Sequence, residues 1–423
     1  MTMNVAARTY RKVMRRVVLV LAGLIVLSSI DRVNVSFAAI RMNADIGLDA
    51  KGYGLGASLF FVGYLLCQIP SAALLRRIGA RRWIAISVGG WGLTAVAMAF
   101  VTVPWEFFAL RILLGAFESG FAPGVVWYVS QWLPAEYRTR SIGLTLLAIP
   151  LSVMIGGPLC GALLKLDLGI LSGWRLMFLV EGGVTVIAGL VALRWFVDAP
   201  HQARWLDDDE RAWIAGNNAP LRADAKGAEP RTNLRDPVLW YAAAIWFALI
   251  TGASAIIFWL PLAIKMTGEN DPLVIGILSA LPWVAIGAGM WLNARHSDRT
   301  GERFGHVAFP AMLAALGVGG AALVGGGAPA LALLVVGGFG LGGAQSVFWS
   351  LPTRYLSQVT PQSIALINLC GNLGSAIAPA AIGWAIARMS LTAPILILAA
   401  LLAAGALLVL PLRTTAILRS QDR

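Results

Sequence analysis

The chain has 423 residues, of which 58% are hydrophobic and 13% are charged, and its mean hydropathy is +0.76. Soluble domains are about 45–50% apolar and about 25% charged, so this composition excludes a disordered chain, a collagen-like chain and an ordinary cytosolic enzyme, and indicates a polytopic membrane protein. The net charge of +12 would suggest nucleic-acid binding in a soluble protein. In a membrane protein it is first a sign of topology, so we expect the lipid bilayer as a partner and no nucleic acid.

A membrane-spanning helix needs about 20 mostly apolar residues. With boundaries good to about four residues, the sequence predicts twelve spans, at residues 17–40, 52–75, 83–103, 105–133, 141–165, 174–197, 237–265, 272–294, 306–325, 329–352, 361–387 and 392–412. Residues 198–236 form the one long polar connector and carry the acidic run Asp207–Glu210. We therefore expect an all-α membrane protein with a six-helix bundle at 1–197, a cytoplasmic linker at 198–236 and a second six-helix bundle at 237–423.

The distribution of Lys and Arg predicts that both termini are cytoplasmic. In this orientation six of them lie outside, namely Arg41, Lys51, Lys165, Arg175, Lys265 and Arg388. Arg32 and Arg111 fall inside spans, which leaves 25 of the 33 on the cytoplasmic side, as expected for a membrane protein. We therefore expect a multi-pass protein of a bacterial-type inner membrane.

The first span also resembles a secretory signal, because a basic segment precedes an apolar run and Ser36–Ala38 resembles a weak cleavage site. The charged pair Asp31-Arg32 precedes that site, and the apolar run is long enough to remain as a span, so we expect no cleavage.

Motifs of enzymes and metal sites are missing from the sequence. The three cysteines have no metal-ligand spacing, the three histidines form no HExxH, and there is no Walker-A loop, GxSxG elbow or Rossmann fingerprint. We therefore expect no catalytic residues, no metal, no cofactor and no enzymatic activity.

A repeat relates the two halves. Arg76–Arg81 aligns with Asp298–Arg303 at an offset of 222 residues, and an arginine, a glycine and an arginine coincide. Both segments follow the second span of their half. Two six-helix repeats related by pseudo-two-fold symmetry are typical of secondary transporters, whose site lies between the halves at mid-membrane.

These features resemble the major facilitator superfamily. The basic turn Arg76–Arg82 resembles its signature loop, Ser297–Arg303 resembles the second copy, and Arg111-xxx-Gly115 is similar to its span-four arginine motif. The resemblance implies the major facilitator fold and a structural or gating role for Arg77, Gly79, Arg81, Arg111, Asp298, Arg299 and Arg303. Arg76 stands where the superfamily usually has an acid, which puts a salt-bridge latch in the first copy in doubt, whereas Asp298 keeps the acid in the second.

A narrower resemblance is to the anion:cation symporter family, which includes the tartrate, phthalate and galactonate permeases. The segments that carry it are Ile30–Asn34, Phe61–Tyr64, Gly79–Trp83, Gly115–Phe121, Phe258–Pro261 and Ile367–Asn372. The resemblance implies a small organic anion as substrate.

Charges inside the spans are the sharpest functional evidence, since each costs about 2.5–3.5 kcal/mol at a helix centre. Arg32 has a planar fork that matches a carboxylate, and we expect it to bind the substrate. The alternative is an ion pair with Glu118, and the two states can alternate. We expect Glu118 to couple protons, because its protonation would free Arg32 to attract an anion. The alternative for Glu118 is a fixed partner of Arg32.

Three further charges lie inside the spans. Asp31 points about 100° away from Arg32 and is either a proton-coupling site or a helix-packing group, with Arg111 as a possible partner. We expect Arg111 to stabilise its span or to relay protons. The alternative is direct contact with the substrate. For Glu181 we expect local pairing near the outer surface.

The second half offers neutral candidates for the substrate site: Trp259, Gln345, Trp349, Ser350, Asn368 and Asn372. Asn368 and Asn372 are four residues apart and share a helix face, so they could read hydroxyl groups or a second carboxylate, or else bond between helices. Trp259 and Trp349 would form apolar walls, or belong to the interfacial belt. Tyr64 of the first half adds a hydroxyl.

The sequence thus predicts a monomeric proton-coupled symporter that imports a small organic anion, such as a hydroxy acid, dicarboxylate or sugar acid, by alternating access. One alternative is a proton antiporter that exports an organic acid or drug. A second is a membrane sensor that transports nothing, which would tolerate Glu118→Gln.

Overall fold

The computed structural model describes residues 5–166, 169, 171–217, 232–357, 359–390 and 392–421. The regular elements of this part are helical. In the first half they are α1 (Val5–Val13), a π-helical turn (Met14–Val18), α2 (Leu19–Asp45), α3 (Ala50–Ile78), α4 (Ala80–Met98), α5 (Pro104–Glu118), α6 (Phe121–Trp132), α7 (Ala135–Lys165), α8 (Gly173–Trp195), a 3-10 turn (Pro200–Gln202) and α9 (Asp208–Asn217). In the second half they are α10 (Pro237–Met266), α11 (Pro272–Thr300), α12 (Gly305–Val324), α13 (Gly327–Phe348), α14 (Ser350–Tyr355), α15 (Pro361–Ile386), α16 (Thr392–Leu407) and α17 (Val409–Gln421).

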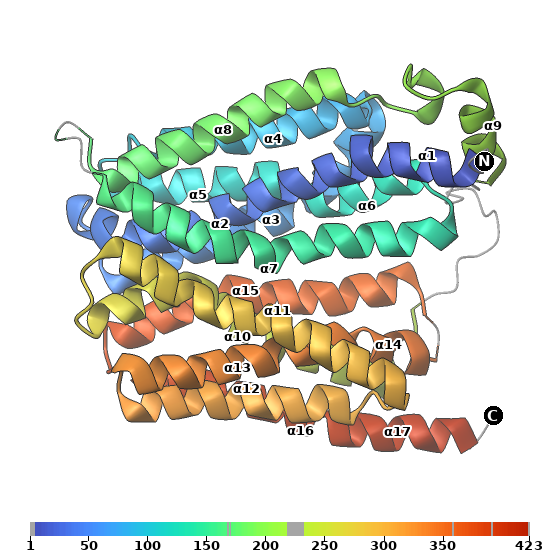
Figure 1. Cartoon of the computed structure of the whole chain (residues 1–423). Coiled ribbons are helices and arrows are strands. Elements are labelled where there is room, and N and C mark those ends of the chain that lie inside the picture. The colour runs from blue at the N-terminus through green and yellow to red at the C-terminus, as the bar shows by residue number, and fades with distance from the viewer. Residues whose placement is uncertain are drawn as a thin grey trace.

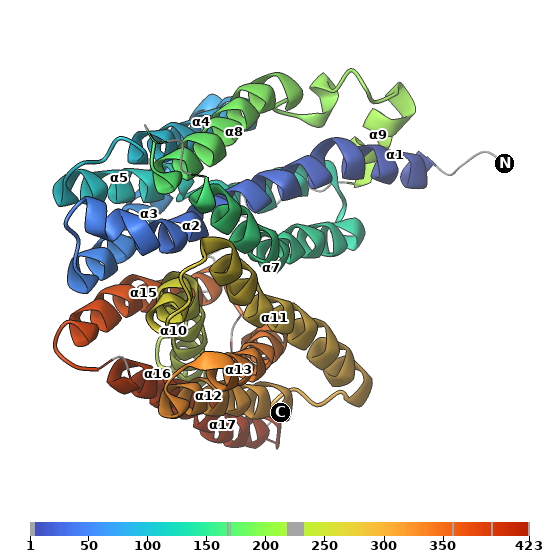
Figure 2. The same ribbon diagram turned by 60° about the vertical axis from the view of Figure 1, so that its left-hand side comes forward.

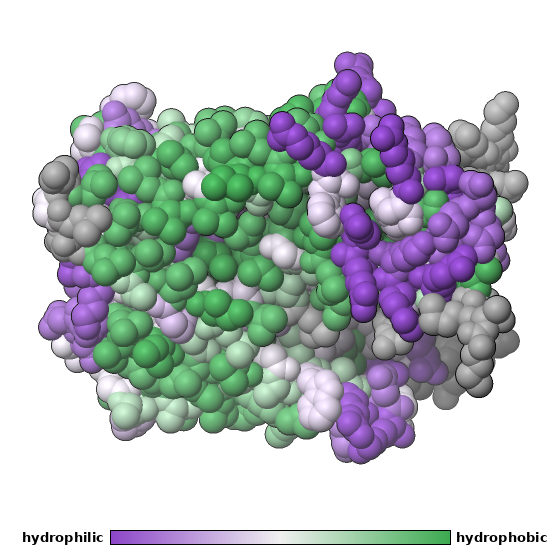
Figure 3. Space-filling model, turned by 45° about the horizontal axis from the view of Figure 1, so that its top comes forward, coloured by the Kyte–Doolittle hydropathy of each residue, from purple (hydrophilic) through white to green (hydrophobic). Residues whose placement is uncertain are grey.

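Eleven helical segments of the described part are long and apolar enough to cross a membrane. The remaining predicted span, 83–103, corresponds to α4, which begins with a basic turn at Arg81 and Arg82 and lies alongside α8 (Figure 1). The face of the molecule shown in Figure 3 carries a broad hydrophobic band between two more hydrophilic ends. The prediction of an all-helical, multi-pass membrane protein is therefore confirmed.

Two predicted spans are interrupted. The span predicted at 105–133 is divided into α5 and α6 at Ser119 and Gly120, so that Glu118 is the last residue of α5. The span predicted at 329–352 is divided into α13 and α14 at Trp349. The first break leaves Glu118 at the end of a helix in the interior of the protein.

Helices α1–α8 lie together as one group and α10–α17 as another (Figure 2). The beginning of α1, the helix α9 and the end of α17 all lie at one end of the molecule, called here the terminal end (Figure 1). The opposite end is called the distal end. Helix α9 is fixed to α1 because Arg8 Nε and Lys12 Nζ each donate to the buried Glu210 carboxylate at 2.8 Å. Residues 218–231 of the predicted linker lie outside the described residues.

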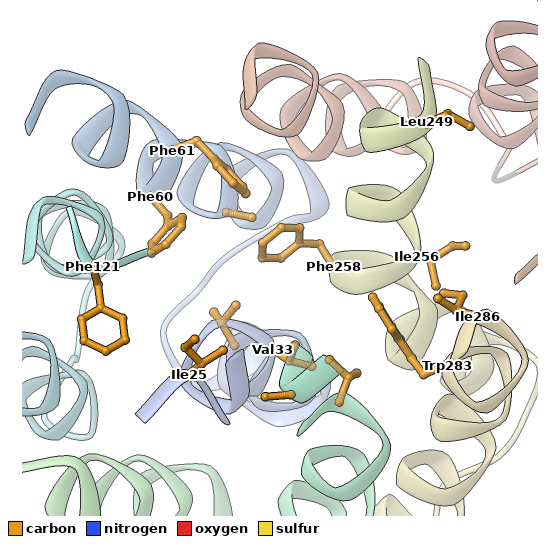
Figure 4. Packing of buried hydrophobic residues seen from close by; sticks show 14 of the residues in the cluster. Ile25, Val33, Phe60, Phe61, Phe121, Leu249, Ile256, Phe258, Trp283 and Ile286 are labelled. Carbon is orange, nitrogen blue, oxygen red and sulfur yellow. The ribbon is translucent and has the colours of Figure 1, made fainter. Parts of the chain in front are cut away.

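Direct contacts join the two groups toward the distal end. Lys165 Nζ of α7 lies 2.7 Å from Asp271 Oδ2, just before α11. The Tyr53 hydroxyl of α3 donates to the Phe258 carbonyl of α10 at 2.7 Å. Phe61 and Phe258 meet edge to face with ring centroids 5.9 Å apart, and Figure 4 shows them facing one another across the boundary between α3 and α10. Polar and aromatic contacts therefore close this part of the boundary.

Candidate functional site

Arg32 and Glu118 are in direct contact in the first half. Arg32 Nη2 of α2 bonds Glu118 Oε1 of α5, and the Ser28 hydroxyl donates to the same oxygen at 2.7 Å. The Arg32 side chain is 33% exposed, whereas that of Glu118 is 3% exposed. The ion pair that the sequence offered as an alternative for Arg32 is thus present, with its cation partly accessible and its anion enclosed.

Aromatic rings surround this pair. The Arg32 guanidinium lies 5.3 Å from the Phe60 ring centroid and 5.9 Å from that of Tyr64. Arg111 approaches the same Phe60 ring at 4.9 Å. A cation over an aromatic face is stabilised by the ring quadrupole, more so away from water. Phe60 was missed by the sequence analysis, although it precedes Tyr64 by one helical turn and therefore shares its face.

Glycine allows α3 and α5 to approach closely enough to form this site. A β-carbon on Gly115 would lie 1.9 Å from the Phe60 carbonyl oxygen. A β-carbon on Gly63 would lie 2.0 Å from the carbonyl oxygen of Ile112. Backbone-to-backbone contact of this kind requires small residues at the crossing, and it sets the rings of α3 against the charges of α5.

Arg111 is completely buried, and its Nε donates to the Gly56 carbonyl at 3.2 Å. Its Nη1 and Nη2 have no hydrogen-bond partner among the described residues. The suggestion that Arg111 pairs with Asp31 is therefore wrong. Asp31 is 2% exposed and instead accepts from Trp91 Nε1 of α4 at 3.1 Å.

Glu181 is buried within the first half. It lies about two turns into α8 and is 6% exposed. Asn34 Nδ2 donates to it at 3.0 Å and Cys160 Sγ at 3.3 Å. Neither partner was expected from the sequence, although Asn34 follows Asp31 by three residues and thus lies on nearly the same face of α2.

The candidates of the second half are less closely gathered. Asn368 is exposed and Asn372 partly exposed, and neither side chain forms a hydrogen bond with a residue that the structure describes. The interhelical bond considered for this pair is therefore not formed. The Ser350 hydroxyl at the start of α14 donates to the Val347 carbonyl near the end of α13 at 2.6 Å, which occupies its proton.

The two tryptophans of the proposed wall lie in aromatic surroundings. Trp349 meets Trp246 edge to face at 5.0 Å between centroids. Trp259 is 5% exposed and meets Tyr53 of the first half at 5.2 Å, with its Nε1 unpartnered among the described residues. Trp259 is therefore a boundary residue between the two halves, not a member of an exposed interfacial belt.

The repeated basic loops are held by acids in different ways. In the first, Arg81 donates through its backbone nitrogen to Asp198 Oδ1 at 2.9 Å. Gly79 has φ +81°, and a β-carbon there would lie 2.4 Å from that same carboxylate. In the second, Arg303 Nη1 lies 2.7 Å from Asp298 Oδ1. Asp198, which follows α8, thus supplies the first loop with an acid from a distant segment.

The remaining predicted members of these loops, Arg77 and Arg299, are exposed.

Comparison with known proteins identifies the family. Residues 21–359 match the model of the Major Facilitator Superfamily. A protein of Agrobacterium vitis named "Putative tartrate transporter" is 39% identical over 91% of this chain and 89% of its own length. The "Quinolone resistance transporter" of Acinetobacter baumannii is 35% identical over 88% and 87%. The "Inner membrane transport protein RhmT" of Escherichia coli K12 is 35% identical over 86% and 85%.

Solved structures agree with this assignment at the level of the fold. A bacterial homologue of the human lysosomal transporter Spinster, in an inward-facing and unoccupied conformation, superposes with a TM-score of 0.74 at 15% identity and covers 97% of both chains. The expectations of a transporter fold and of a protein that is not an enzyme are confirmed. The chain belongs to the Major Facilitator Superfamily and is a multi-pass secondary transporter.

Proposed function

We propose that the protein is a proton-coupled symporter that imports a small organic anion by alternating access. The observation that carries this proposal is the contact between the partly exposed Arg32 and the enclosed Glu118. An ionised Glu118 neutralises Arg32. When Glu118 takes up a proton, it loses its charge and Arg32 becomes available to a carboxylate. Proton and anion then enter together, because each favours the binding of the other.

The substrate we infer carries at least one carboxylate and hydroxyl groups. Arg32 would bind the carboxylate through two hydrogen bonds. Tyr64, Asn368 and Asn372 would read hydroxyl groups or a second carboxylate, with Ser350 as a weaker candidate because its proton is already used. Trp259 and Trp349 would contribute apolar walls. A relative with "tartrate" in its name supports a hydroxy acid of this kind.

The proton and gating roles follow from the same geometry. We propose Asp31 as a further proton-coupling carboxyl, because it is buried and its hydrogen-bond donors, Trp91 and Thr185, are neutral. Arg111 would support the site from behind Phe60. The two basic loops would brace the terminal end through Gly79, Arg81, Asp298 and Arg303, with Arg77 and Arg299 at the surface.

We also propose that the terminal end faces the cytoplasm of a bacterial-type inner membrane, since most of the Lys and Arg residues lie there. Residues 1–197 and 237–423 would act as two rocking bundles joined by the linker 198–236, in a monomer. The contacts that join the halves toward the distal end, such as Lys165–Asp271, fit a state closed to the outside.

A second candidate is proton-coupled export of an organic acid or drug. The relative named for quinolone resistance supports it, because the identity and coverage are close to those of the tartrate-named relative. Such an exporter would keep Glu118 as its proton site but would not need Arg32 to bind a carboxylate.

Uptake of labelled organic acids into proteoliposomes separates these functions. We expect an inward proton gradient to drive accumulation of at least one hydroxy acid or dicarboxylate, and collapse of the gradient to abolish it. Accumulation driven by an outward proton gradient would favour the exporter. Absence of any gradient-dependent movement of organic acids or quinolones would discard both.

A further inference from the structure

Two hydrogen bonds link α2 and α8 inside the first half. Thr185 of α8 donates to Asp31 of α2 at 2.9 Å, and three residues further along α2, Asn34 donates to Glu181 at 3.0 Å. The two helices run in opposite directions, so Asp31 pairs with Thr185 and Asn34 with Glu181 one turn apart. The bonds form successive rungs between the helices. Two carboxyl groups therefore lie about one helical turn apart, on facing helices.

Glu181 is enclosed by neutral hydrogen-bond donors. It is 6% exposed, and its two oxygens accept from Asn34 Nδ2 and, at 3.3 Å, from the Cys160 thiol of α7. No Lys, Arg or His of the described residues forms an ion pair with it. A buried carboxylate without a cation is costly, and two hydrogen bonds offset only part of that cost. The site can therefore hold Glu181 either as an anion or as a protonated acid.

A second observation concerns Asn34. This residue is 1% exposed, and its Oδ1 has no hydrogen-bond partner among the described residues. A protonated carboxyl group is a donor and needs an acceptor. The Asn34 amide carries both kinds of group, so a half-turn about its last bond would present Oδ1 to Glu181 in place of Nδ2. The amide can thus satisfy the carboxyl group in either charge state.

We propose that Glu181, together with Asn34 and Cys160, is an additional proton-binding site of the transporter, separate from the Arg32–Glu118 pair and from Asp31. The proposal rests on the proposed symport function. In the anionic state, Asn34 and Cys160 each donate to one carboxylate oxygen. A proton taken from the aqueous phase binds one of these oxygens, and the Asn34 amide then turns to accept it. Release of the proton during the cycle restores the first arrangement.

The groups that neighbouring helices place around Glu181 couple its titration to that of a second carboxyl group. Helix α2 contributes Asp31 and Asn34, and α7 contributes the Cys160 thiol. Helix α4 contributes Trp91, which does not titrate and which donates to Asp31. Asp31 is thus the charged neighbour of Glu181. Two carboxylates in one dry interior disfavour each other's ionisation, so their titrations are coupled.

The position of Glu181 suggests the side from which it is reached. A third bond between α2 and α8, from Trp174 Nε1 to Asp45 Oδ2 at 2.6 Å, lies at the distal end. Glu181 lies between this bond and Asp31 along both helices. A proton that enters from the distal end would therefore meet Glu181 before Asp31.

Infrared difference spectroscopy of the purified full-length protein tests the site without transport. A pH step should reveal a carboxylic C=O band that is absent in Glu181→Gln, and a shift of the Cys160 S–H band when the carboxyl group ionises. The exposed Glu136 provides the control, because Glu136→Gln should retain both signals. Two results would overturn the proposal. One is that Glu181→Gln still shows the carboxylic band, and the other is that the parent protein shows no titrating carboxylic band.

The thiol offers a second variant if Glu181→Gln does not fold. Cys160→Ala should move the midpoint of the carboxyl titration, because the anion loses one of its two donors, and Cys160→Ser should restore the midpoint by supplying a hydroxyl donor. A midpoint that neither variant moves would remove Cys160 from the site and contradict the proposal.

The number of protons moved with each anion tests the role in transport. It can be measured in proteoliposomes from the membrane potential that brings net anion flux to zero. We expect Glu181→Gln to lower this number by one while anion exchange persists, and an unchanged number would refute the role. If the parent protein shows no proton-driven uptake, the proposed symport function fails, whereas the infrared titration still decides whether Glu181 binds a proton.

Discussion

Asp31 and Arg32 are neighbours in α2, yet their side chains bond to different helices. Asp31 accepts from Trp91 of α4 and Thr185 of α8, whereas Arg32 contacts Glu118 of α5. One residue turns an α-helix by about 100°, which is enough to direct the two charges into separate surroundings. The acid is enclosed within the first half, and the cation is left partly exposed and able to meet a substrate.

Replacement of Arg32 should abolish anion uptake. Arg32→Ala removes the group that we propose binds the carboxylate, so uptake of every anion into proteoliposomes should be lost. Arg32→Lys keeps the charge but not the planar fork. Hydrogen bonds to charged groups are worth about 1.5–3 kcal/mol, so the apparent affinity should fall by about 10- to 100-fold. Unaltered uptake by Arg32→Ala would refute the binding role.

Glu118→Gln should separate binding from coupling. Glutamine is uncharged at every pH and leaves Arg32 permanently available, so exchange of labelled for unlabelled anion should persist. Accumulation driven by a pH gradient should be lost, because no proton is taken up at this position. The exposed Glu136→Gln variant should behave like the parent in both assays. Gradient-driven accumulation by Glu118→Gln would exclude Glu118 as the coupling site.

Gly115→Ala should destabilise the protein because its β-carbon would overlap the Phe60 backbone oxygen, which cannot swing aside. Overpacking of this kind costs about 1–3 kcal/mol, so the melting temperature in detergent should fall and uptake should drop with it. Gly23→Ala is the matched control, because a β-carbon there meets nothing within 4 Å. In that helix position alanine is expected to be neutral or stabilising by up to about 1 kcal/mol. Equal melting temperatures for the two variants would contradict the packing argument.

The Lys165–Asp271 ion pair should make closure of the distal end depend on pH. The Lys165 ammonium holds the pKa of the Asp271 carboxyl below its ordinary value. Stabilisation by the pair is therefore complete above the ordinary carboxyl pKa and is lost as the pH falls through the lowered value. Spin labels at residues 51 and 389 should report more separated halves at acidic pH than at neutral pH.

Asp271→Asn should produce the same separation at neutral pH, because asparagine keeps the hydrogen bond to the Leu273 nitrogen at the start of α11 but carries no charge. Lys165→Met should separate the halves to the same extent, and the double variant Lys165→Met with Asp271→Asn should not separate them further. Distances that stay unchanged in both single variants would show that the pair does not hold the halves together.

Most of the fold could be predicted from the sequence, because apolar stretches of sufficient length, with most Lys and Arg in the connections on one side, admit few arrangements. The helix break after Glu118 was not predicted, since the apolar run continues through it and only Gly120 marks the place. The sequence also left open which acid supports the first basic loop. Asp198 lies more than one hundred residues from Gly79, and only the folded chain brings the two together.

For the site, the sequence by itself determined which charged residues lie within the membrane. Because so few charges fall inside the spans and each is costly there, Asp31, Arg32, Arg111 and Glu118 could be identified as candidates. Only the tertiary structure decided their partners. Helical period gives the direction of a side chain on its own helix, but not which helix faces it, and that depends on packing between segments far apart in the chain. For this reason the pairing of Arg32 with Glu118 was anticipated only as an alternative, and the burial of Glu181 against Asn34 and Cys160 was not anticipated at all.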